Sequence, residues 1–242
     1  MTVLLSLQEV TKFFGGIAAL DGFRLDVATG DMLGLIGPNG SGKTTLLNII
    51  GGYYRADGGR ILLSGERIDG RSPTWLARRG LGRSFQVTKV FRRLTVLENL
   101  LVPALAAATV RRDTAESKAR GVLVDLNLTH LADARAETLS GGQGKLLEFG
   151  RIMMLDPRLV LLDEPFGGVH PELKAFMHER IRAWNAAGVT IVLISHDMGS
   201  IFGLCDRVAV LSYGALIAEG APDSVRKDPQ VLDAYLGTHH ES

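Results

Sequence analysis

The fold of this chain is decided by Gly37-Pro38-Asn39-Gly40-Ser41-Gly42-Lys43-Thr44. This stretch fits the pattern G-x-x-x-x-G-K-[ST], which is typical of a loop that binds nucleotide phosphates. Residues 32–36 before it are typical of a buried strand, and residues 45–50 after it are typical of a helix. A glycine-rich turn without a ligand is the alternative, but the positive end of a helix dipole at such a turn favours an anion.

Individual residues of this loop have predicted tasks. We expect Lys43 to reach the β- and γ-phosphates and the Thr44 hydroxyl to bind Mg²⁺. The glycines let backbone N–H groups turn toward the phosphates without a Cβ clash. The residues predicted to contact a nucleotide from this side are Gly37, Pro38, Asn39, Gly40, Ser41, Gly42, Lys43, Thr44 and Thr45.

Composition and charge limit the classes of protein. A length of 242 residues predicts one large domain or one domain with an insertion. The net charge of +1 provides no global field that would attract nucleic acid or anionic lipid. The single cysteine, Cys205, excludes an intrachain disulfide and favours a reduced, cytosolic compartment. We expect no signal peptide in residues 1–10, and the apolar stretch 100–110 is too short to span a bilayer.

The order of apolar segments predicts an α/β fold with a mostly parallel sheet, because buried strands alternate with helices. A helical insertion is predicted over residues 95–136, where Leu and Ala recur at helical spacing between charged residues. A long amphipathic helix is predicted over residues 171–187. The predicted strands and hairpins lie at 4–10, 23–27, 60–68, 159–162, 189–194 and 208–218.

Polar side chains follow two of these strands. Asp163 and Glu164 lie at a carboxyl edge, where ligands bind in open α/β sheets. An aspartate there can hold Mg²⁺, and a glutamate beside it can orient and polarise an attacking water, which suits phosphoryl transfer. His196 follows another strand at the same edge and can donate a hydrogen bond to a γ-phosphate. The alternatives are carboxylates that only solvate a strand end and a structural histidine.

A second glycine-rich turn, Leu139-Ser140-Gly141-Gly142-Gln143, precedes a helix predicted over 145–155. Its amides, the Ser140 hydroxyl and the helix dipole favour a second anion. One chain then has two phosphate-binding helix starts and one P-loop. We infer that each nucleotide lies between the P-loop of one subunit and this turn of another, in an ATP-dependent dimer. Gln86, just before the helical insertion, can bind Mg²⁺ or water in one conformation and release it in another.

Together these motifs resemble those of the ATP-binding-cassette (ABC) ATPases over essentially the whole chain. The resemblance implies a P-loop NTPase (RecA-like) core with an N-terminal antiparallel β subdomain and an inserted α-helical subdomain. The implied boundaries are 1–86 and 154–242 for the core and 87–153 for the helical part. The implied activity is ATP hydrolysis with ATP and Mg²⁺ as cofactors.

The resemblance also assigns roles to single residues. Adenine would stack on Phe14, with Phe13 as the alternative. The implied catalytic residues are Glu164, His196, Gln86 and Lys43, with Glu164 as the base. The implied magnesium ligands are Thr44, Gln86 and Asp163. The implied contacts to the partner's nucleotide are Ser140, Gly141, Gly142 and Gln143.

Residues 83–86, 94–99 and 228–237 are similar to cassettes of bacterial importers of branched-chain or related amino acids and acids. That resemblance implies a second ATPase subunit (homo- or heterodimer), integral-membrane permease subunits, and a periplasmic or extracellular substrate-binding protein. It implies a place on the cytoplasmic face of the inner membrane, held through the permease. A lipopolysaccharide-exporter cassette shares residues 91–94 and 163–166, so export of lipid is an alternative. A soluble cassette acting on nucleic acid or ribosomes is disfavoured by the near-zero charge, and we expect no nucleic-acid partner.

Two features depart from the family pattern. His170 stands where that family has Asp or Asn, in the loop that links the two nucleotide sites. Gly144, Lys145 and Gly150 replace commoner polar and alanine residues after the second turn. Since glycine in a helix costs roughly 0.5–1 kcal/mol against alanine, we expect this helix to be loose.

Overall fold

The computed structural model describes residues 2–85, 89–106 and 112–236. In this part of the chain the larger sheet has six strands. The five strands from β9 to β6 are parallel, and β10 pairs antiparallel with β9. The predicted α/β fold with a mostly parallel sheet is therefore confirmed. In spatial order the strands are β10 (Ala215–Gly220), β9 (Arg207–Ser212), β3 (Met32–Ile36), β8 (Thr190–Ile194), β7 (Leu159–Asp163) and β6 (Leu81–Arg83).

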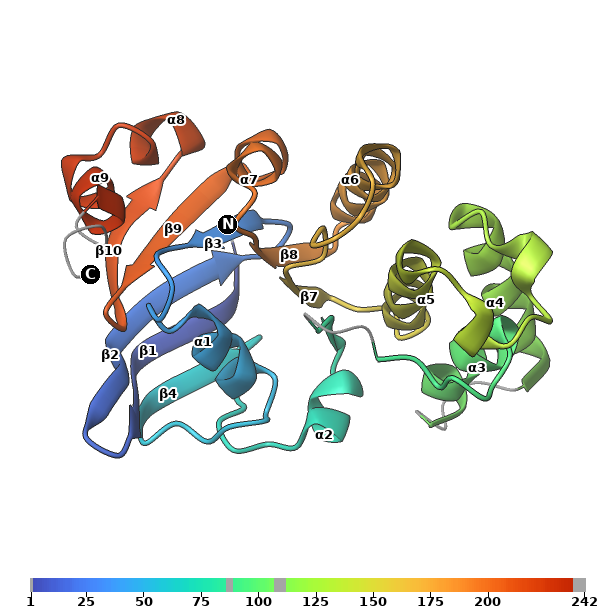
Figure 1. Cartoon of the computed structure of the whole chain (residues 1–242). Coiled ribbons are helices and arrows are strands. Elements are labelled where there is room, and N and C mark those ends of the chain that lie inside the picture. The colour runs from blue at the N-terminus through green and yellow to red at the C-terminus, as the bar shows by residue number, and fades with distance from the viewer. Residues whose placement is uncertain (1, 86–88, 107–111, 237–242) are drawn as a thin grey trace.

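A second, antiparallel sheet covers one side of the larger one, coloured blue to cyan in Figure 1. Its order is β2 (Ile17–Ala28), β1 (Val3–Phe14), β4 (Gly58–Leu63) and β5 (Glu66–Arg67). Both long strands exceed the predicted ranges 4–10 and 23–27. The reason is that their pairing shifts register, for example between Leu7 and Val10. Such bulges interrupt the alternation of side chains from which a strand's length is predicted.

Both faces of the larger sheet are buried. On β3, Leu33 and Leu35 join a cluster with α1 (Lys43–Ile50) and the antiparallel sheet. Met32 and Ile36 join the cluster on the opposite face, which includes residues of α6 (Pro171–Ala186) and α7 (Met198–Leu204). Burial on both faces explains why the parallel strands are continuous apolar runs in the sequence. The remaining helices on this body are α2 (Pro73–Ala77), α8 (Pro222–Val225) and α9 (Pro229–Leu236).

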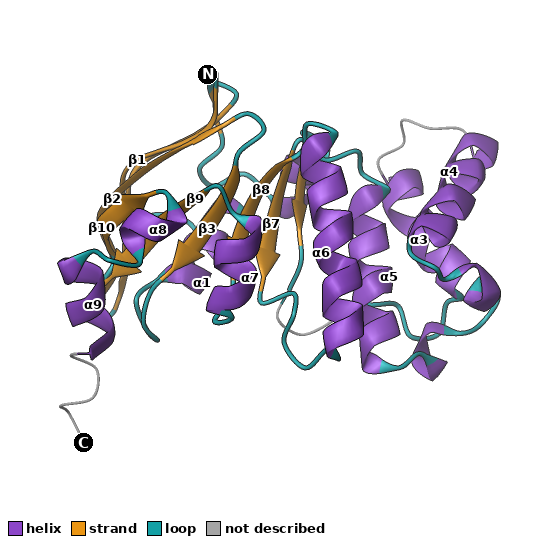
Figure 2. Ribbon diagram, turned by 90° about the horizontal axis from the view of Figure 1, so that it is seen from above, coloured by secondary structure: helices purple, strands orange, loops and turns teal. Residues whose placement is uncertain are grey.

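The predicted helical insertion contains α3 (Val96–Ala106), α4 (Arg112–Asp125) and two short 3₁₀ turns, Thr129–Leu131 and Ala136–Thr138. With α5 (Gly141–Met153) it lies at the end of the molecule away from α8 and α9 (Figures 1 and 2). Helix α5 begins four residues earlier than predicted, because Ser140 caps it. Phe149 of α5 stacks on Trp184 of α6, with ring centroids 4.0 Å apart. The helical segment thus shares one apolar cluster with the sheet, and its boundaries, 87–153, stay a prediction.

The loop before α3 is held by a buried side chain. Asn99 is fully buried, and its Oδ1 accepts the backbone N–H of Phe91 at 2.8 Å. Its Nδ2 donates to the carbonyls of Phe91 and Thr95 at 3.0 and 2.9 Å. A buried amide with these partners fixes the loop to the helix, because leaving them unpaired would cost about 1–3 kcal/mol. None of the described helices is long and apolar enough to cross a membrane.

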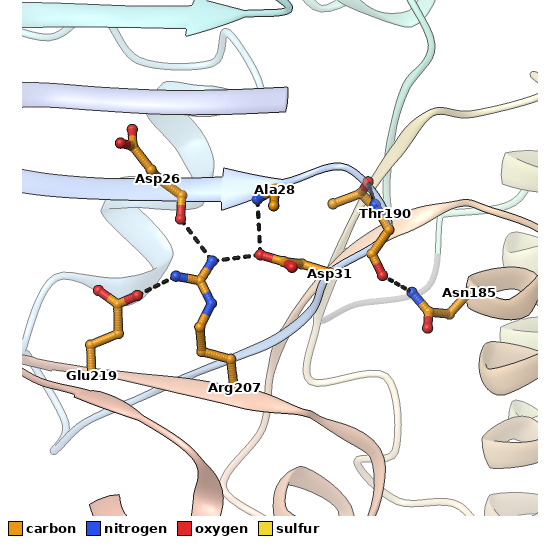
Figure 3. A network of polar contacts seen from close by, with 8 residues as sticks. Asp26, Ala28, Asp31, Asn185, Thr190, Arg207 and Glu219 are labelled. Carbon is orange, nitrogen blue, oxygen red and sulfur yellow. Dashed lines mark hydrogen bonds and ion pairs between the residues drawn. The ribbon is translucent and has the colours of Figure 1, made fainter. Parts of the chain in front are cut away.

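The amino-terminal ends of the parallel strands are joined by a polar network (Figure 3). The guanidinium of Arg207 donates to Asp31 Oδ2 at 2.6 Å and to the Asp26 carbonyl at 2.7 Å, and it pairs with Glu219. Thr190 Oγ1 accepts the N–H of Gly30 at 2.9 Å. These contacts fix the starts of β8 and β9 to the turn before β3, at the edge opposite the glycine-rich loop.

Gly150 corrects one expectation from the sequence, because the helix that contains it is tightly packed rather than loose. A Cβ at Gly150 would lie 2.8 Å from Leu126 Cδ1, 2.9 Å from Leu100 Cδ2 and 3.1 Å from Val122 Cγ1. All three side chains are buried. The missing side chain therefore lets α5 approach α3 and α4.

We predict that Gly150→Val lowers the free energy of unfolding by about 1–3 kcal/mol, because it overpacks this contact. Gly121 on α4 is the matched control, since a Cβ there would meet nothing within 4 Å. Gly121→Val should leave stability unchanged or slightly higher, because valine has a better helix propensity than glycine. Urea unfolding of both variants checks this, and equal stability of the two would contradict it.

Candidate active site

The turn between β3 and α1 requires glycine for packing reasons. Gly37 and Gly42 have φ of +151° and +108°. A Cβ on Gly37 would lie 2.0 Å from the Leu211 carbonyl oxygen, and one on Gly42 would lie 2.3 Å from that of Ala19. The loop is thus pressed against the end of β9 and against β2, which fixes its curvature.

At the start of helix α1, no side chain of the helix neutralises the positive end of the helix dipole. Its N-cap residue, Gly42, makes no side-chain capping hydrogen bond, and its first turn has no acidic residue. The first backbone N–H groups of a helix lack intrahelical partners and carry the positive end of the dipole. This end of α1 therefore suits an anion such as a phosphate.

Lys43 is buried against the same loop, with 8% of its surface exposed. Its Nζ donates to the carbonyls of Gly37 and Pro38, both at 2.8 Å, and to Ser41 Oγ at 3.2 Å. Burial lowers the pKa of Lys43, while the negative charges of Glu164 and Asp163 act in the opposite direction. The ammonium and the two carboxylates therefore belong to one electrostatic cluster.

Asp163 is the last residue of β7 and is buried, with 4% exposed. Its backbone N–H donates to Ser84 Oγ at 3.0 Å, and its Oδ2 lies 3.7 Å from Arg83 Nη2. Burial raises the pKa of Asp163, and the positive charge of Arg83 is the main opposing effect. Arg83 and Ser84 were not predicted as site residues, although residues 83–86 belong to the stretch that resembles importer cassettes; they lie at the end of the short strand β6.

Glu164 has a left-handed backbone, with φ of +49°, which is uncommon for a residue other than glycine. Its backbone N–H donates to the Ile194 carbonyl at 3.0 Å, which continues the sheet pairing past the end of β7. Glu164 Oε1 is buried without a hydrogen-bond partner among the described residues. It lies 3.5 Å from His196 Nε2. An orphaned carboxylate oxygen beside an exposed imidazole suits a group that binds water or substrate.

These groups line one cleft of about 280 Å³ at the carboxyl edge of the sheet. The cleft brings together Lys43, Asp163, Glu164 and His196, which the sequence analysis predicted to meet there. The residues that line it are Ala19, Asn39, Gly40, Ser41, Gly42, Lys43, Thr44, Thr45, Asp163, Glu164, Ile194 and His196.

The donor set of this cleft fits Mg²⁺ with a nucleotide rather than a metal held by protein alone. Among the described residues no group of three or more His, Cys, Asp or Glu side chains is placed to hold a metal ion. Thr44 and Asp163 supply one hydroxyl and one carboxylate to the cleft. Mg²⁺ is commonly bound by one or two such protein oxygens together with substrate phosphates and water.

Other predicted site residues lie elsewhere. Gln86 is outside the described residues. Phe13 and Phe14 are both about half exposed and are absent from the lining of the cleft, and the Phe14 ring contacts Tyr54 edge-on. Stacking of adenine on Phe14, with Phe13 as the alternative, stays a prediction.

The second glycine-rich turn also lies outside this cleft. Ser140 Oγ accepts the N–H of Gln143 at 3.3 Å, and the Ser140 N–H donates to Gln143 Oε1 at 2.9 Å. This reciprocal cap starts α5. The turn therefore does not line the nucleotide cleft of its own chain. The prediction that it contacts a nucleotide bound to another subunit requires this.

Two family models match the chain. One, described as "ABC transporter", matches residues 20–167. The other, described as "Branched-chain amino acid ATP-binding cassette transporter", matches residues 215–241. The glycine-rich loop, Gln86, the second glycine-rich turn and Asp163-Glu164 lie inside the first match, whereas Phe14 and His196 lie outside both.

The chain is also similar to named proteins over nearly its whole length. It is 37% identical to the probable branched-chain amino acid transport ATP-binding protein LivG of Archaeoglobus fulgidus, covering 97% of this chain and 95% of that one. It is 37% identical to the high-affinity branched-chain amino acid transport ATP-binding protein BraF of Pseudomonas aeruginosa, covering 97% and 98%.

The chain is also similar to solved structures of ATP-binding cassettes. The ADP conformation of MJ1267, an ATP-binding cassette of an ABC transporter, has a TM-score of 0.87 and 35% identity, covering 98% of this chain and 100% of that one. A dimeric post-hydrolysis state of the cassette MJ0796, bound to ADP and Pi, has a TM-score of 0.82 and 25% identity, covering 90% and 99%. The chain therefore belongs to the ABC transporter family, in which it is an ATP-binding subunit with ATPase activity.

Proposed function

We propose that the chain hydrolyses Mg-ATP in the cleft between the glycine-rich loop and Glu164, and that it powers an importer of branched-chain or related amino acids. The observation that carries the proposal is the convergence of Lys43, Asp163, Glu164 and His196 in one cleft. The names of the relatives and the match of the C-terminal segment to a branched-chain cassette model support the cargo class. The alternative of a lipid exporter has no comparable support.

Each residue has a proposed step. The N–H groups at the start of α1 bind the β-phosphate, and Lys43 moves its ammonium from the loop carbonyls to the β- and γ-phosphates. Glu164 Oε1 takes the proton of the attacking water, since this oxygen is buried beside His196 and has no hydrogen-bond partner within the described part of the chain. His196 Nε2 donates to the γ-phosphate and holds it in line. Mg²⁺, bound by Thr44 and Asp163 and, as the family resemblance implies, by Gln86, would neutralise phosphate charge.

A second copy or a related cassette completes the site in this proposal. The Ser140–Gln143 turn starts α5 but does not line the cleft of its own chain. The N–H groups of Gly141 and Gly142, which the cap does not use, and the helix dipole suit the γ-phosphate of a nucleotide bound to the partner. The dimeric state of the cassette MJ0796 with ADP and Pi supports this arrangement. Binding of ATP would then close the dimer, and hydrolysis would open it.

A separate groove suits the permease. It has a volume of about 520 Å³ and lies between α2, residues 83–85 and 89–91, α3 and α5. Its walls combine the aromatic rings of Tyr53, Phe85 and Phe91 with cationic side chains, among which Arg151 lies over the Phe91 ring, 4.7 Å from its centroid. Such a lining favours an apolar segment with acidic residues, and we propose that a cytoplasmic helix of the permease docks there. The chain would thus be held at the cytoplasmic face of the membrane, with a substrate-binding protein on the other side.

We predict that Glu164→Gln lowers the rate of Mg-ATP hydrolysis on the order of 10²–10⁴-fold, which is the usual worth of a general base. Affinity for Mg-ATP should stay close to that of the wild type, because the amide keeps the shape of the side chain. Phosphate release and nucleotide titration of the purified chain measure the two quantities. Lys43→Ala should instead lose most of the nucleotide affinity.

Glu116→Gln is the matched control for this test, since Glu116 pairs with Arg120 on the surface of α4, far along the chain from the cleft residues. Its hydrolysis rate should equal that of the wild type. A Glu164→Gln variant that turns over ATP at the wild-type rate would refute the role of this carboxylate as base.

We predict that Phe91→Asp weakens association with the permease subunits by at least about 10-fold, because buried aromatic residues dominate many interfaces. Hydrolysis by the isolated chain should not change. The control is Val124→Asp, since Val124 is 67% exposed on α4 and does not line the groove. Co-purification in detergent measures the association, and equal recovery of both variants would rule out docking at this groove.

A further inference from the structure

Ser195 is a buried side chain at the site to which the proposed mechanism assigns no step. It follows β8 directly and has 4% of its surface exposed. Its Oγ accepts the backbone N–H of Asp197 at 3.1 Å and donates to Glu164 Oε2 at 3.3 Å. A serine hydroxyl has one hydrogen to donate. The Asp197 N–H approaches a lone pair and cannot take this hydrogen, which is donated to the Glu164 carboxylate.

Because of this contact, the two carboxylate oxygens of Glu164 have different surroundings. The terminal torsion of a glutamate is broad, so a carboxylate without a partner rotates easily. Ser195 holds Oε2, and Oε1 is the oxygen that lies 3.5 Å from His196 Nε2. Oε1 is the oxygen left without a hydrogen-bond partner among the described residues. The serine therefore selects which oxygen faces the reacting groups.

The turn that carries Ser195 is itself held from another helix. The Asp197 carboxylate accepts Ser200 Oγ at 2.8 Å and pairs with Lys174 of α6. The hydrogen bond from Lys174 is the main reason why the pKa of Asp197 is lowered to about 2, so this residue is ionised at neutral pH. His178 of α6 lies 2.9 Å from the same Ser200 hydroxyl. These contacts from α6 keep the backbone N–H of Asp197 directed at Ser195.

We propose that Ser195 is a positioning residue for ATP hydrolysis, which holds Glu164 Oε2 so that Oε1 faces the attacking water. The inference rests on the proposed role of Glu164 as base. It adds a residue that acts through Glu164 and does not touch the nucleotide, since Ser195 is absent from the lining of the cleft.

The test uses Ser195→Ala and Ser195→Cys in the full chain. We expect kcat for Mg-ATP hydrolysis to fall about 10- to 100-fold, the effect of a lost hydrogen bond to a charged group. KM for ATP should change less than about 2-fold, because no nucleotide contact is removed. Cysteine keeps nearly the size of serine but donates weakly, so its kcat should fall even if the alanine variant folds poorly. A wild-type kcat in either folded variant overturns the proposal.

A double-mutant cycle separates positioning from a general structural role. In a Glu164→Gln background, Ser195→Ala should cause no further loss of the residual rate, because the group on which it acts is already disabled. A further loss equal to that seen in the wild-type background would overturn the proposal. Wild-type turnover by Glu164→Gln alone would instead overturn the proposed function, so the two failures are distinguishable.

Thr190 is the matched control at the other end of β8 (Figure 3). It is fully buried, and its hydroxyl accepts the Gly30 N–H at 2.9 Å, roughly 16 Å along the strand from Ser195. Thr190→Val should lower the melting temperature and leave kcat unchanged. If it lowers kcat as much as Ser195→Ala does, the effect belongs to the integrity of β8 and the proposal fails.

Discussion

The register of three parallel strands is the constraint on which the site depends. Leu35 of β3 and Asp163 of β7 both pair with Ile194 of β8. The glycine-rich loop, Glu164 and the Ser195-His196 turn therefore leave the sheet at the same level. A slip of one residue would turn each side chain to the opposite face, so the packed clusters on both faces maintain the register. The chemistry of the cleft is thus a consequence of how the sheet is buried.

The helical segment is tied to this edge through α5. Lys145 Nζ donates to the Pro165 carbonyl at 3.3 Å, directly after Glu164. Glu148 accepts the backbone N–H of Phe85 at 3.3 Å, and burial raises the pKa of this carboxyl. The helix that starts at the Ser140 turn therefore contacts both the strand end with the proposed base and the segment beside the proposed permease groove. A movement of α5 would therefore displace both the segment after Glu164 and the segment that contains Phe85.

Much of the fold and of the site could be predicted because their signals are local. Apolar runs that end in Asp163 or His196, and a glycine-lysine loop between a strand and a helix, are visible in the sequence itself. Strand β6 was missed because three residues provide no period. Arg83 and Ser195 were missed because their contacts join separate strands. Gly150 was misinterpreted, since helix propensity does not reveal the leucines packed against it.

The most direct test of this account is the mass of the hydrolysis-blocked chain in solution, measured by light scattering. With Mg-ATP, Glu164→Gln should pair with a second copy, at twice the chain mass of 26.1 kDa, or with the related cassette when that subunit is added. Without nucleotide it should be a monomer. Adding Gly141→Asp should abolish the dimer, because a carboxylate beside the phosphates repels them and a Cβ at Gly141 meets nothing within 4 Å in its own chain. The contradicting result is a Glu164→Gln chain that binds Mg-ATP but never pairs with a second copy or a related cassette, even together with its permease. In that case two cassettes do not share one nucleotide.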